Sequence, residues 1–276
     1  MNLFIDSGAT KCDCILLDEA GKYVRHISDS GINASYTADA EIDGIFARLA
    51  ADIGELDKVT AIQFAGAGCG NPDNALRIEN ALRRHFGESK QITVESDLLG
   101  ACKILCGASS GIVSILGTGA SCCLFNGKEI VQQIPSAGYM LGDEGSGTHL
   151  GMLFIQRFLR EELPPEIVSI ARLQRSDVIR RIYREPHPNR YFSSFARFIG
   201  EHRTEPAIRS IIQEAFRQFF KIQISHINNY RSYPLNIVGS VGYYFQDDIR
   251  ETADLFHVEI GRIEISPLSA IRQGQR

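Results

Sequence analysis

The sequence predicts an α/β protein of two similar lobes, with a helical insertion in the second lobe. Three observations support this prediction. The chain has 276 residues, of which 44% are hydrophobic, which is enough for two sizeable cores. A strand, a glycine-rich turn and a second strand near the N-terminus recur in the middle of the chain. Apolar runs also alternate with amphipathic helical patterns, which indicates β-to-α-to-β order.

The repeat is the strongest of these signals. Its copies read "FIDSGATKCDCILL" and "SILGTGASCCLF". Each begins with an apolar run, Leu3–Ile5 or Ile112–Leu116, and passes at once into a turn rich in Gly, Ser and Thr. Each then returns through a second apolar run, Cys12–Leu17 or Cys122–Phe125. Both copies are therefore predicted to be β-hairpins.

The rest of the first lobe, residues 1–106, follows in β-to-α order. A helix is predicted within "AEIDGIFARLAADIG", because its apolar residues recur at helical spacing. The runs "AIQFAG" and "QITVES" are predicted strands, separated by a helix over 73–86. A further helix is predicted to start near Asp97.

The second lobe, residues 107–276, restarts at Gly111 and contains a long helical stretch over about 148–230. Two strand signals follow this stretch, "LNIVGS" and "VEIGRIEIS", so the helices form an insertion between strands. No low-complexity linker separates the lobes, which favours a packed, hinged pair. Packing of the C-terminal end against the first lobe is left open.

Composition and charge exclude several classes of protein. The net charge of -4 provides no basic surface for nucleic acid. The N-terminus has no basic leader, and no apolar run approaches the roughly 20 residues that a bilayer requires, so we expect a cytoplasmic protein without a membrane partner. The seven cysteines include no CxxC pair and are expected to be small buried side chains. A homodimer is left open.

The two glycine-rich turns suggest a nucleotide site. If similar lobes face one another, their turns lie on opposite walls of one cleft, where backbone N–H groups can approach phosphates without an intervening Cβ atom. No GxxxxGK[ST] motif is present, and no GxGxxG motif joins a strand to a helix. A P-loop and a dinucleotide fold are therefore disfavoured.

Four motifs resemble those of a known family. "DSGATK" and "GTGAS" resemble its two phosphate motifs, "GDEGSG" its diagnostic loop and "IVGSVG" its adenosine motif. In this order they are similar to the N-acetylglucosamine kinase and BadF/BadG/BcrA/BcrD ATPase group of the actin and hexokinase superfamily. Ser7 and Ser240 stand where the family usually has glycine. The resemblance implies two ribonuclease H-like, actin-like ATPase lobes flanking a nucleotide cleft, with ATP and Mg²⁺ as ligands.

Chemistry and this resemblance together assign the nucleotide side. The predicted ATP contacts are small or polar residues in the four motifs: Ser7, Gly8, Thr10, Lys11, Gly117, Thr118, Gly119, Gly239, Ser240 and Gly242. Asp6 ends a strand and is predicted to hold Mg²⁺ through water, the alternative being a turn-capping aspartate. Lys11 is either a phosphate ligand or a solvated hairpin residue.

The acceptor side depends more on the resemblance. Asp97 lies where the family has its catalytic carboxylate, which makes it the predicted general base; its alternative is a plain helix N-cap. The predicted sugar contacts are Asn33, Thr118, Gly119 and Asp143, with Glu144 as a weaker candidate. Ser146 or Thr148 is expected to cap the following helix.

The predicted function is an ATP-dependent kinase for a hydroxyl of an amino sugar, most simply N-acetylglucosamine giving its 6-phosphate. The alternative is an ATPase that activates an acyl-CoA dehydratase or reductase and carries an iron-sulfur cluster. Cys69, Cys102 and Cys106 are the candidate ligands for that cluster, and their apolar surroundings favour core packing. A nucleotide-gated sensor without turnover is disfavoured by the presence of Asp6 and Asp97.

Overall fold

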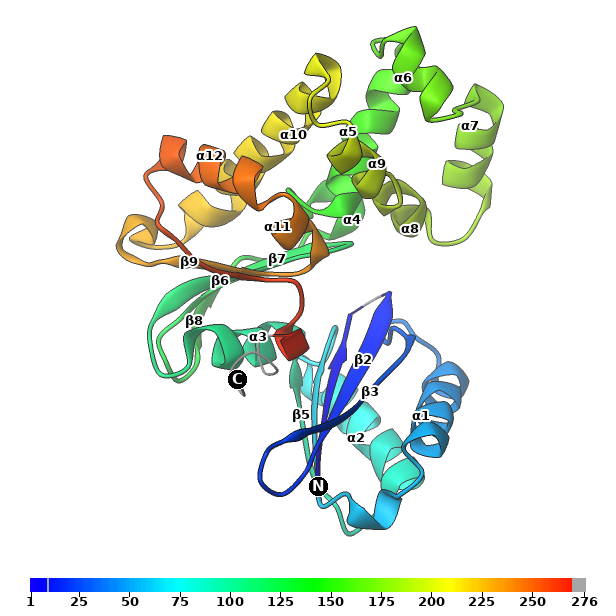
Figure 1. Cartoon of the computed structure of the whole chain (residues 1–276), viewed down its shortest axis with the longest axis vertical. Coiled ribbons are helices and arrows are strands. Elements are labelled where there is room, and N and C mark those ends of the chain that lie inside the picture. Colours follow the sequence, from blue (N-terminus) through cyan, green and yellow to red (C-terminus); the bar gives the residue numbers. More distant parts are fainter. Residues whose placement is uncertain (9, 270–276) are drawn as a thin grey trace. The chain divides into compact units, whose positions relative to one another are not determined.

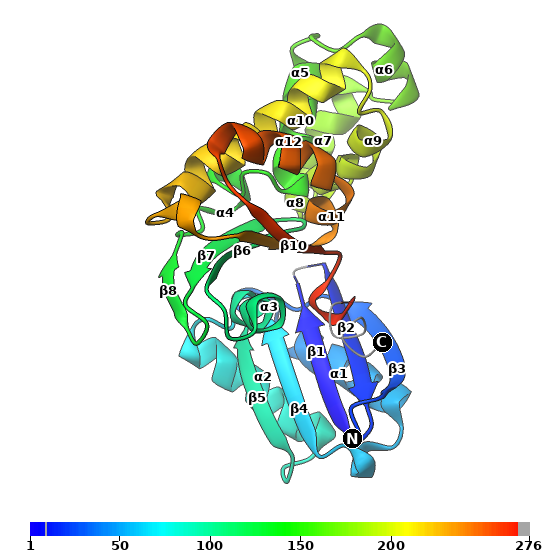
Figure 2. The same cartoon turned by 60° about the vertical axis from the view of Figure 1, so that its left-hand side comes forward.

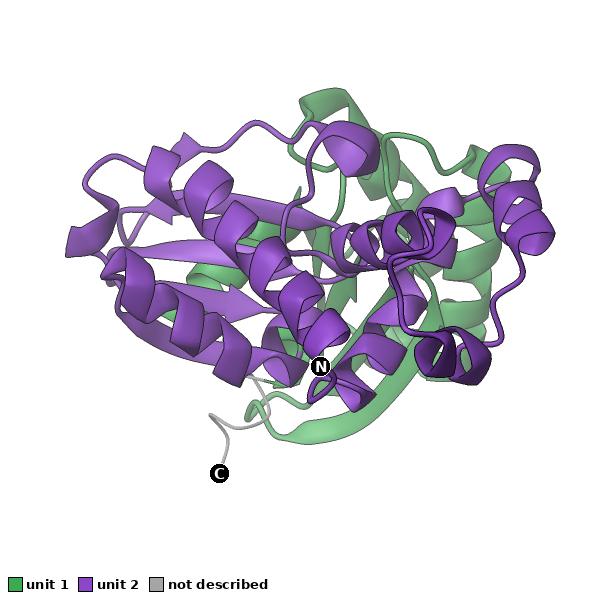
Figure 3. Cartoon of the chain, turned by 90° about the horizontal axis from the view of Figure 1, so that it is seen from above, with its two compact units in different colours: residues 1–107, 266–276 green, residues 108–265 purple. Residues whose placement is uncertain are grey.

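The computed structural model describes residues 1–8 and 10–269. The chain divides into two compact units (Figure 3). Unit 1 comprises Met1–Gly107 and the segment from Ser266 onward, and unit 2 comprises Ala108–Ile265. Each unit is built on one five-stranded sheet.

Unit 1 has the strand order β3-β2-β1-β4-β5 (Figures 1 and 2). Its strands are β1 (Asn2–Ser7), β2 (Lys11–Leu17), β3 (Tyr23–Ser30), β4 (Ala61–Gly66) and β5 (Gln91–Ser96). Its helices are α1 (Asp39–Ile53), the 3-10 turn η1 (Leu56–Lys58), α2 (Pro72–Phe86) and α3 (Asp97–Cys106). Helices α1 and α2 pack on one face of the sheet, where Leu3 and Ile5 are buried with Ile42 and Ile78.

The opposite face of this sheet carries α3 and the residues that return from the C-terminal end. Gly100 of α3 lies so close to Ala65 of β4 that an added Cβ atom would be 2.6 Å from the Ala65 Cβ. Leu268 packs with Ile15, Leu17 and Phe4 on this same face. Because successive residues of a strand point to opposite faces, Asp6 shares the face of Phe4.

Unit 2 has the strand order β10-β9-β6-β7-β8. Its strands are β6 (Gly111–Leu116), β7 (Ala120–Phe125), β8 (Ile130–Gln133), β9 (Leu235–Val238) and β10 (Ile260–Glu264). Its α-helices are α4 (Gly138–Leu141), α5 (Gly147–Leu159), α6 (Pro165–Ile170), α7 (Arg175–Arg184), α8 (Pro188–Ser193), α9 (Phe195–Glu201), α10 (Pro206–Gln218), α11 (Ser240–Tyr244) and α12 (Gln246–Phe256). A π-helix, η2 (Phe219–Gln223), continues α10 into the 3-10 turns η3 (Ile224–His226) and η4 (Tyr230–Ser232).

The two sheets have the same topology. In each, the first strand pairs antiparallel with the second and parallel with the fourth, while the fifth lies beyond the fourth. The predicted α/β fold and its internal repeat are therefore confirmed. The third strands, β3 and β8, were not predicted. Both are edge strands whose largely exposed sequences lack a regular apolar alternation.

The predicted helical insertion is also confirmed, and it builds much of the core of unit 2. Helices α4 to α10 and the turns after them lie between β8 and β9. Phe154 of α5 and Phe216 of α10 are fully buried, as are Phe219 and Phe220 of the π-helix. Among the described residues, no helix combines the length and apolarity needed to cross a bilayer.

Candidate functional site

The turn between β1 and β2 gathers charged side chains of unit 1. The Gly8 N–H donates to the Lys11 carbonyl oxygen at 3.0 Å, which closes the turn. Asp6 and Asp13 are register partners across the two strands, so both side chains lie on the same face of the sheet. The Lys11 Nζ atom lies 2.8 Å from Asp13 Oδ1. The predicted phosphate ligand Lys11 is thus paired with a carboxylate beside Asp6.

Asp13 was not among the predicted site residues, although it has three polar partners. Besides Lys11, the Ser28 hydroxyl donates to Asp13 Oδ1 at 2.5 Å, and His26 Nε2 lies 2.9 Å from the same atom. Burial alone would raise the pKa of Asp13, but the hydrogen bonds from Lys11, Ser28 and His26 outweigh it and lower that pKa. Asp13 is therefore an ionised neighbour of Asp6 at neutral pH.

Asp6 and Asp97 are carboxyl groups of unit 1 whose pKa values are both raised. Burial, followed by the charges of Asp97 and Asp13, raises the pKa of Asp6 to about 7, although Lys11 acts in the opposite direction. Burial also raises the pKa of Asp97, while its hydrogen bonds from backbone N–H groups lower it. A carboxyl group whose charge is destabilised by burial and by a neighbouring carboxylate is typical of functional sites.

The helix that begins at Asp97 is capped by its neighbour. Ser96 is the N-cap residue of α3, and its hydroxyl accepts a hydrogen bond from the Leu99 N–H at 3.1 Å. Asp97 is the first helical residue, and its Oδ1 accepts from the Leu98 N–H at 2.8 Å. The alternative role of N-cap therefore belongs to Ser96.

The carboxylates of unit 1 fit a hydrated divalent cation. Among the described residues, no three His, Cys, Asp or Glu side chains are arranged to hold a metal ion directly. Mg²⁺ usually keeps several water ligands and is bound through one or two carboxylates plus the phosphates of its nucleotide. Asp6 can fill that role, because a cation would offset the burial and the neighbouring negative charges that raise its pKa.

Ser7 and Gly31 support the first turn from behind. The Ser7 side chain is fully buried; its hydroxyl donates to the Ile32 carbonyl oxygen at 3.3 Å and accepts from the Ile32 N–H at 2.9 Å. The prediction that Ser7 binds phosphate therefore does not extend to its hydroxyl. At Gly31 an added Cβ atom would lie 2.2 Å from the Gly8 carbonyl oxygen, so only glycine lets this segment pack against the turn. Thr10 is exposed in the turn itself.

Asn33 lies in a loop after β3 and uses much of its amide within that loop. Its Oδ1 accepts from the Ser35 N–H at 2.9 Å, and its Nδ2 donates to the Tyr36 hydroxyl at 2.7 Å. Arg77 of α2 secures the loop by donating to the carbonyl oxygens of Ala34 and Thr37. The amide oxygen and the amide nitrogen of Asn33 can each form one further hydrogen bond, which a sugar hydroxyl could use.

In unit 2, the turn between β6 and β7 meets the loop that contains "GDEGSG". The Gly147 N–H donates to the Gly117 carbonyl oxygen at 2.8 Å, and the Thr148 hydroxyl donates to the Thr118 carbonyl oxygen at 2.6 Å. The Asp143 carboxylate lies against Gly119, where an added Cβ atom would be 3.0 Å from Asp143 Oδ2. The structure therefore brings together the predicted residues Gly117, Thr118, Gly119 and Asp143.

Asp143 and the residues that follow it have distinct roles. Burial raises the pKa of Asp143, opposed by a hydrogen bond from the Ala120 backbone. Glu144, the weaker candidate for a sugar contact, is only 7% exposed and accepts a hydrogen bond from Gln223. Ser146 is the N-cap of α5, as its hydroxyl accepts from the His149 N–H at 3.1 Å.

The predicted adenosine motif lies at the end of β9 and in α11. Gly239 precedes α11 and packs against the Leu116 carbonyl oxygen, next to the β6–β7 turn. Gly242 packs against Ile237 and Leu116, and Ser240 is the first residue of α11. Gly239 therefore adjoins Gly117 within unit 2.

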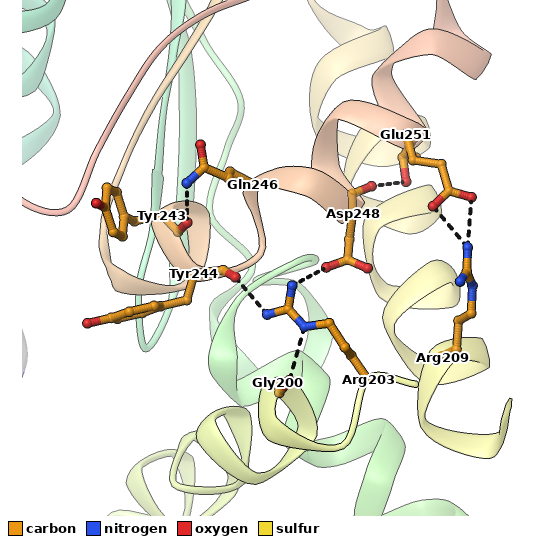
Figure 4. A network of polar contacts seen from close by, with 9 residues as sticks. Gly200, Arg203, Arg209, Tyr243, Tyr244, Gln246, Asp248 and Glu251 are labelled. Carbon is orange, nitrogen blue, oxygen red and sulfur yellow. Dashed lines mark hydrogen bonds and ion pairs between the residues drawn. The ribbon is translucent and has the colours of Figure 1, made fainter. Parts of the chain in front are cut away.

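A polar network holds the C-terminal end of α11 (Figure 4). Arg203 donates from Nη2 to the Tyr244 carbonyl oxygen at 2.9 Å and from Nε to the Gly200 carbonyl oxygen at 3.0 Å. Its Nη1 lies 3.6 Å from Asp248 Oδ2, and its guanidinium group stacks over the Phe245 ring at 5.5 Å. One arginine from the helical insertion thus fixes the position of the motif helix.

Two of the three candidate cluster cysteines lie in the interior of unit 1. Cys102 is fully buried and Cys69 is 4% exposed, whereas Cys106, the last residue of α3, is partly exposed. Burial raises the pKa of Cys69 to about 12, which disfavours the thiolate that an iron-sulfur ligand requires. The burial of Cys69 and Cys102 agrees with the prediction that they are core residues, whereas Cys106 is only partly buried.

Comparison with protein-family models gives a match over residues 3–218 to the BadF/BadG/BcrA/BcrD ATPase family. The chain belongs to this family. The comparison with curated protein sequences gave no match.

Solved structures extend the similarity to the whole chain. A Porphyromonas gingivalis protein named "Putative N-acetylglucosamine Kinase" is 35% identical, with a TM-score of 0.93 over 99% of this chain and 98% of that chain. A ROK family glucokinase from Streptomyces griseus, in complex with glucose and AMPPNP, is 16% identical, with a TM-score of 0.66 over 99% of both chains. MreB5 of Spiroplasma citri, bound to ADP, is 10% identical, with a TM-score of 0.63 over 99% of this chain and 94% of that chain. The family member therefore has the actin-like ATPase fold.

Proposed function

We propose that this ATPase family member is a sugar kinase that transfers the γ-phosphoryl group of ATP to a hydroxyl of an amino sugar, most simply N-acetylglucosamine to give its 6-phosphate. One observation carries the proposal: Asp97 is a partly buried carboxyl group whose charge raises the pKa of Asp6, and Ser96 takes the capping role in its place. The similarity to a protein that bears the name of an N-acetylglucosamine kinase supports the choice of acceptor.

In this proposal Asp97 is the general base. Its carboxylate accepts the proton of the acceptor hydroxyl while that oxygen attacks the γ-phosphorus atom in line. A general base works best when its pKa lies near the operating pH, and burial moves the pKa of Asp97 in that direction. Little covalent work remains for the protein beyond positioning and charge neutralisation.

Other residues of unit 1 are proposed to bind Mg²⁺ and the phosphates of the nucleotide. Asp6 would hold Mg²⁺ through water, and the ion would supply charge neutralisation at the phosphates. The β1–β2 turn offers the backbone of Gly8, the Thr10 hydroxyl and the Lys11 ammonium group to the phosphates. Asp13 keeps Lys11 beside the turn through their 2.8 Å contact.

Unit 2 supplies backbone surfaces and one acceptor carboxylate. Gly117, Thr118 and Gly119 present their backbone to phosphate and sugar, whereas Gly239, Ser240 and Gly242 accommodate the adenosine. Asp143 accepts hydrogen bonds from sugar hydroxyls, and Asn33 of unit 1 contributes an amide that both donates and accepts. The proposed setting is the cytoplasm, where Mg-ATP is available.

A substrate panel tests this function. The full chain is incubated with Mg-ATP and, separately, with N-acetylglucosamine, N-acetylmannosamine, glucosamine and glucose, and ADP release is recorded. We expect N-acetylglucosamine to increase ADP release well above the rate without sugar, and ³¹P NMR to show a 6-phosphate. The Asp97→Asn variant should lack this increase. If no sugar increases the rate of ADP release, the proposal is overturned.

A second assay separates the kinase from the iron-sulfur activator. Protein purified without oxygen is analysed for iron and acid-labile sulfide. We expect neither in stoichiometric amount, since Cys69 and Cys102 are buried in the core of unit 1. Stoichiometric iron and sulfide would favour the activator instead.

A further inference from the structure

A buried polar pair in unit 2 has no role in the chemistry described so far. Gln223 Nε2 donates to Glu144 Oε2 at 2.6 Å, and the two residues are 6% and 7% exposed. Their surroundings include Phe219, Phe220 and Ile224, all fully buried. A buried carboxyl group is costly unless it is hydrogen-bonded, and an apolar pair of similar size usually serves stability as well or better. This pair therefore calls for a role beyond packing.

Gln223 reaches Glu144 because the helix that carries it changes its winding. The α-helix α10 ends at Gln218 and continues as the π-helix η2, Phe219–Gln223. Hydrogen bonds from residue i to i+5 make a wider turn than in an α-helix and alter the direction of the side chains that follow. Such π segments are rare and frequently occur at functional sites. Here the segment ends at the residue that holds Glu144.

The loop held by Gln223, residues 143–147, has a demanding backbone. Asp143 has φ 57° and Gly145 has φ 80°, both in the left-handed region. A non-glycine residue there is uncommon and persists only when its surroundings enforce it. At Gly145 an added Cβ atom would lie 2.8 Å from the Phe219 Cβ, so the π-helix packs directly on the loop backbone. Glu144 is anchored between these two residues.

The same loop presents the Asp143 carboxylate. Asp143 lies against Gly119 of the β6–β7 turn, and the Ser146 N–H donates to the Asp143 carbonyl oxygen at 3.0 Å. The Gly145 N–H donates to His149 Nδ1 at 3.1 Å. If Glu144 were released, the peptide units on both sides of it would keep only these two hydrogen bonds, and the Asp143 carboxylate would be held less firmly.

We propose that Gln223 is a positioning residue that acts through Glu144 to hold the 143–147 loop and thereby sets the affinity for the acceptor sugar. The role of Asp143 in sugar binding rests on the proposed function, whereas the holding of the loop does not. Displacement of a binding group by about 1 Å can cost on the order of 100-fold in rate. The expected effect falls on the acceptor, because Glu144 adjoins Asp143 in the chain and not the adenosine motif.

The test compares Gln223→Met with Gln132→Met. Methionine keeps the length of the side chain and removes its donor. Gln132 is a matched control: it donates to the His226 carbonyl oxygen at 2.8 Å and accepts from the Asn228 N–H at 2.9 Å, but none of these contacts involves the 143–147 loop. Glu144→Gln is the conservative variant, because an amide oxygen still accepts from Gln223.

Kinetics and hydrogen exchange provide independent measurements. We expect Gln223→Met to raise the sugar KM about 10-fold or more, with the ATP Kd within about twofold of the wild type. Amide exchange over 143–147, followed by mass spectrometry, should accelerate about 10-fold or more in Gln223→Met. Gln132→Met should lower the melting temperature without changing the sugar KM or the amide exchange over 143–147. Glu144→Gln should stay near the wild type in both measurements.

Several results would overturn the inference. Unchanged exchange over 143–147 in Gln223→Met would show that Gln223 is a core residue alone, whether or not the protein is a kinase. Accelerated exchange with an unchanged sugar KM would refute the link to the acceptor. If the wild type shows no sugar-dependent turnover, the kinase proposal fails while the exchange result still decides the loop. Should Gln223→Met not fold, the shorter Gln223→Asn is measured in the same way, and wild-type exchange there counts against the inference.

Discussion

Next to the turn that joins its first two strands, unit 1 pairs Asp6 with Asp13, whereas unit 2 pairs Ile115 with Ser121 at the corresponding place in its sheet. The sheets have the same strand order and pairing, yet the first turn adjoins Asp6, Asp13 and Lys11, whereas the second adjoins one carboxylate, Asp143, and the backbone of the 143–147 loop. The polar positions beside a turn contribute little to either core. They are therefore free to differ while the topology stays the same.

Because of this difference, we expect the two units to contribute differently to the proposed reaction. Unit 1 holds the two proposed reaction residues, Asp6 and Asp97, and the pKa of about 7 for Asp6 reflects first its burial and then the charge of Asp97. Unit 2 has a single site carboxylate, Asp143, and relies on glycine backbone and on the helical insertion to position it. Substitutions in unit 1 should therefore affect chemistry and cation binding, and those in unit 2 should affect affinity.

The largest expected effect tests the base in unit 1. Asp97→Asn keeps the size of the side chain but removes proton acceptance, so kcat should fall about 100- to 10,000-fold with much smaller changes in KM. Asp143→Asn in unit 2 should instead raise the sugar KM. Steady-state kinetics with the accepted sugar measure both.

The matched control is the neighbouring cap. Ser96→Ala removes the hydroxyl that accepts from the Leu99 N–H and should cost about 1 kcal/mol of stability while kcat stays near the wild-type value. If Asp97→Asn behaves like Ser96→Ala, with a lower melting temperature and near-normal kcat, Asp97 serves only the start of α3.

The next effect concerns pH and the stability of the protein without nucleotide or divalent cation. The pKa of Asp6 is raised from 3.8 to about 7, so between these values the native state keeps a proton that the unfolded state has released. Stability is highest below the unfolded value and is lost as the pH rises through the native value. Asp6→Asn removes this loss and should be more stable than the wild type by a few kcal/mol, on the order that a shift of this size implies, at pH 8.

Urea unfolding of both proteins from pH 4 to pH 8 measures this difference. The curves should agree near pH 4 and separate toward pH 8, while Asp6→Asn has a weakened dependence of activity on Mg²⁺. Asp13→Asn should show the opposite trend, because the pKa of Asp13 is lowered and its stabilisation is lost on acidification. Parallel curves for Asp6→Asn and the wild type would refute the raised pKa.

A smaller effect compares the two glycine turns directly. An added Cβ atom at Gly8 would meet only the Lys11 carbonyl oxygen, at 3.9 Å, and at Gly117 it would meet nothing within 4 Å. Neither glycine is required by packing, so Gly8→Ala and Gly117→Ala should keep the melting temperature. If phosphates approach both turns, each substitution should weaken ATP binding about 10-fold, measured by calorimetry.

Gly31→Ala is the contrasting variant, because its Cβ atom would collide with the Gly8 carbonyl oxygen. It should lower both stability and ATP affinity. Unchanged ATP affinity in Gly117→Ala, together with reduced affinity in Gly8→Ala, would assign the phosphates to unit 1 alone and break the proposed symmetry.

The smallest effect concerns two arginines of unit 2 that Figure 4 shows together. Arg203 holds the end of α11, whereas Arg209 forms an exposed pair with Glu251 at 3.3 Å. Arg203→Ala should raise the ATP Kd a few-fold, since α11 carries the adenosine motif. Arg209→Ala should change it little, as exposed ion pairs are worth about 0–1 kcal/mol. Equal ATP affinities for the two variants would show that α11 does not depend on Arg203.

The sequence by itself determined the strands next to each core, the long helices and the repeat. "AIQFAG" and "QITVES" are β4 and β5, and the predicted helix over 73–86 is α2 with Pro72 added at its start. These predictions depend on apolar periodicity within short windows, which burial in either unit preserves. The edge strands β3 and β8 escaped prediction because an edge strand needs no regular apolar face.

Only the tertiary structure decided which polar atoms meet. Ser96 and Asp97 are both good capping residues, and the backbone geometry at the start of α3 selected Ser96. Asp13 gained its partners through the register of β2 and β3. Glu144 and Gln223 are 79 positions apart, and their contact depends on a π-helix that periodicity does not reveal. Hydrogen bonds require a match of position and direction within tenths of an ångström, which arises only when distant segments have packed.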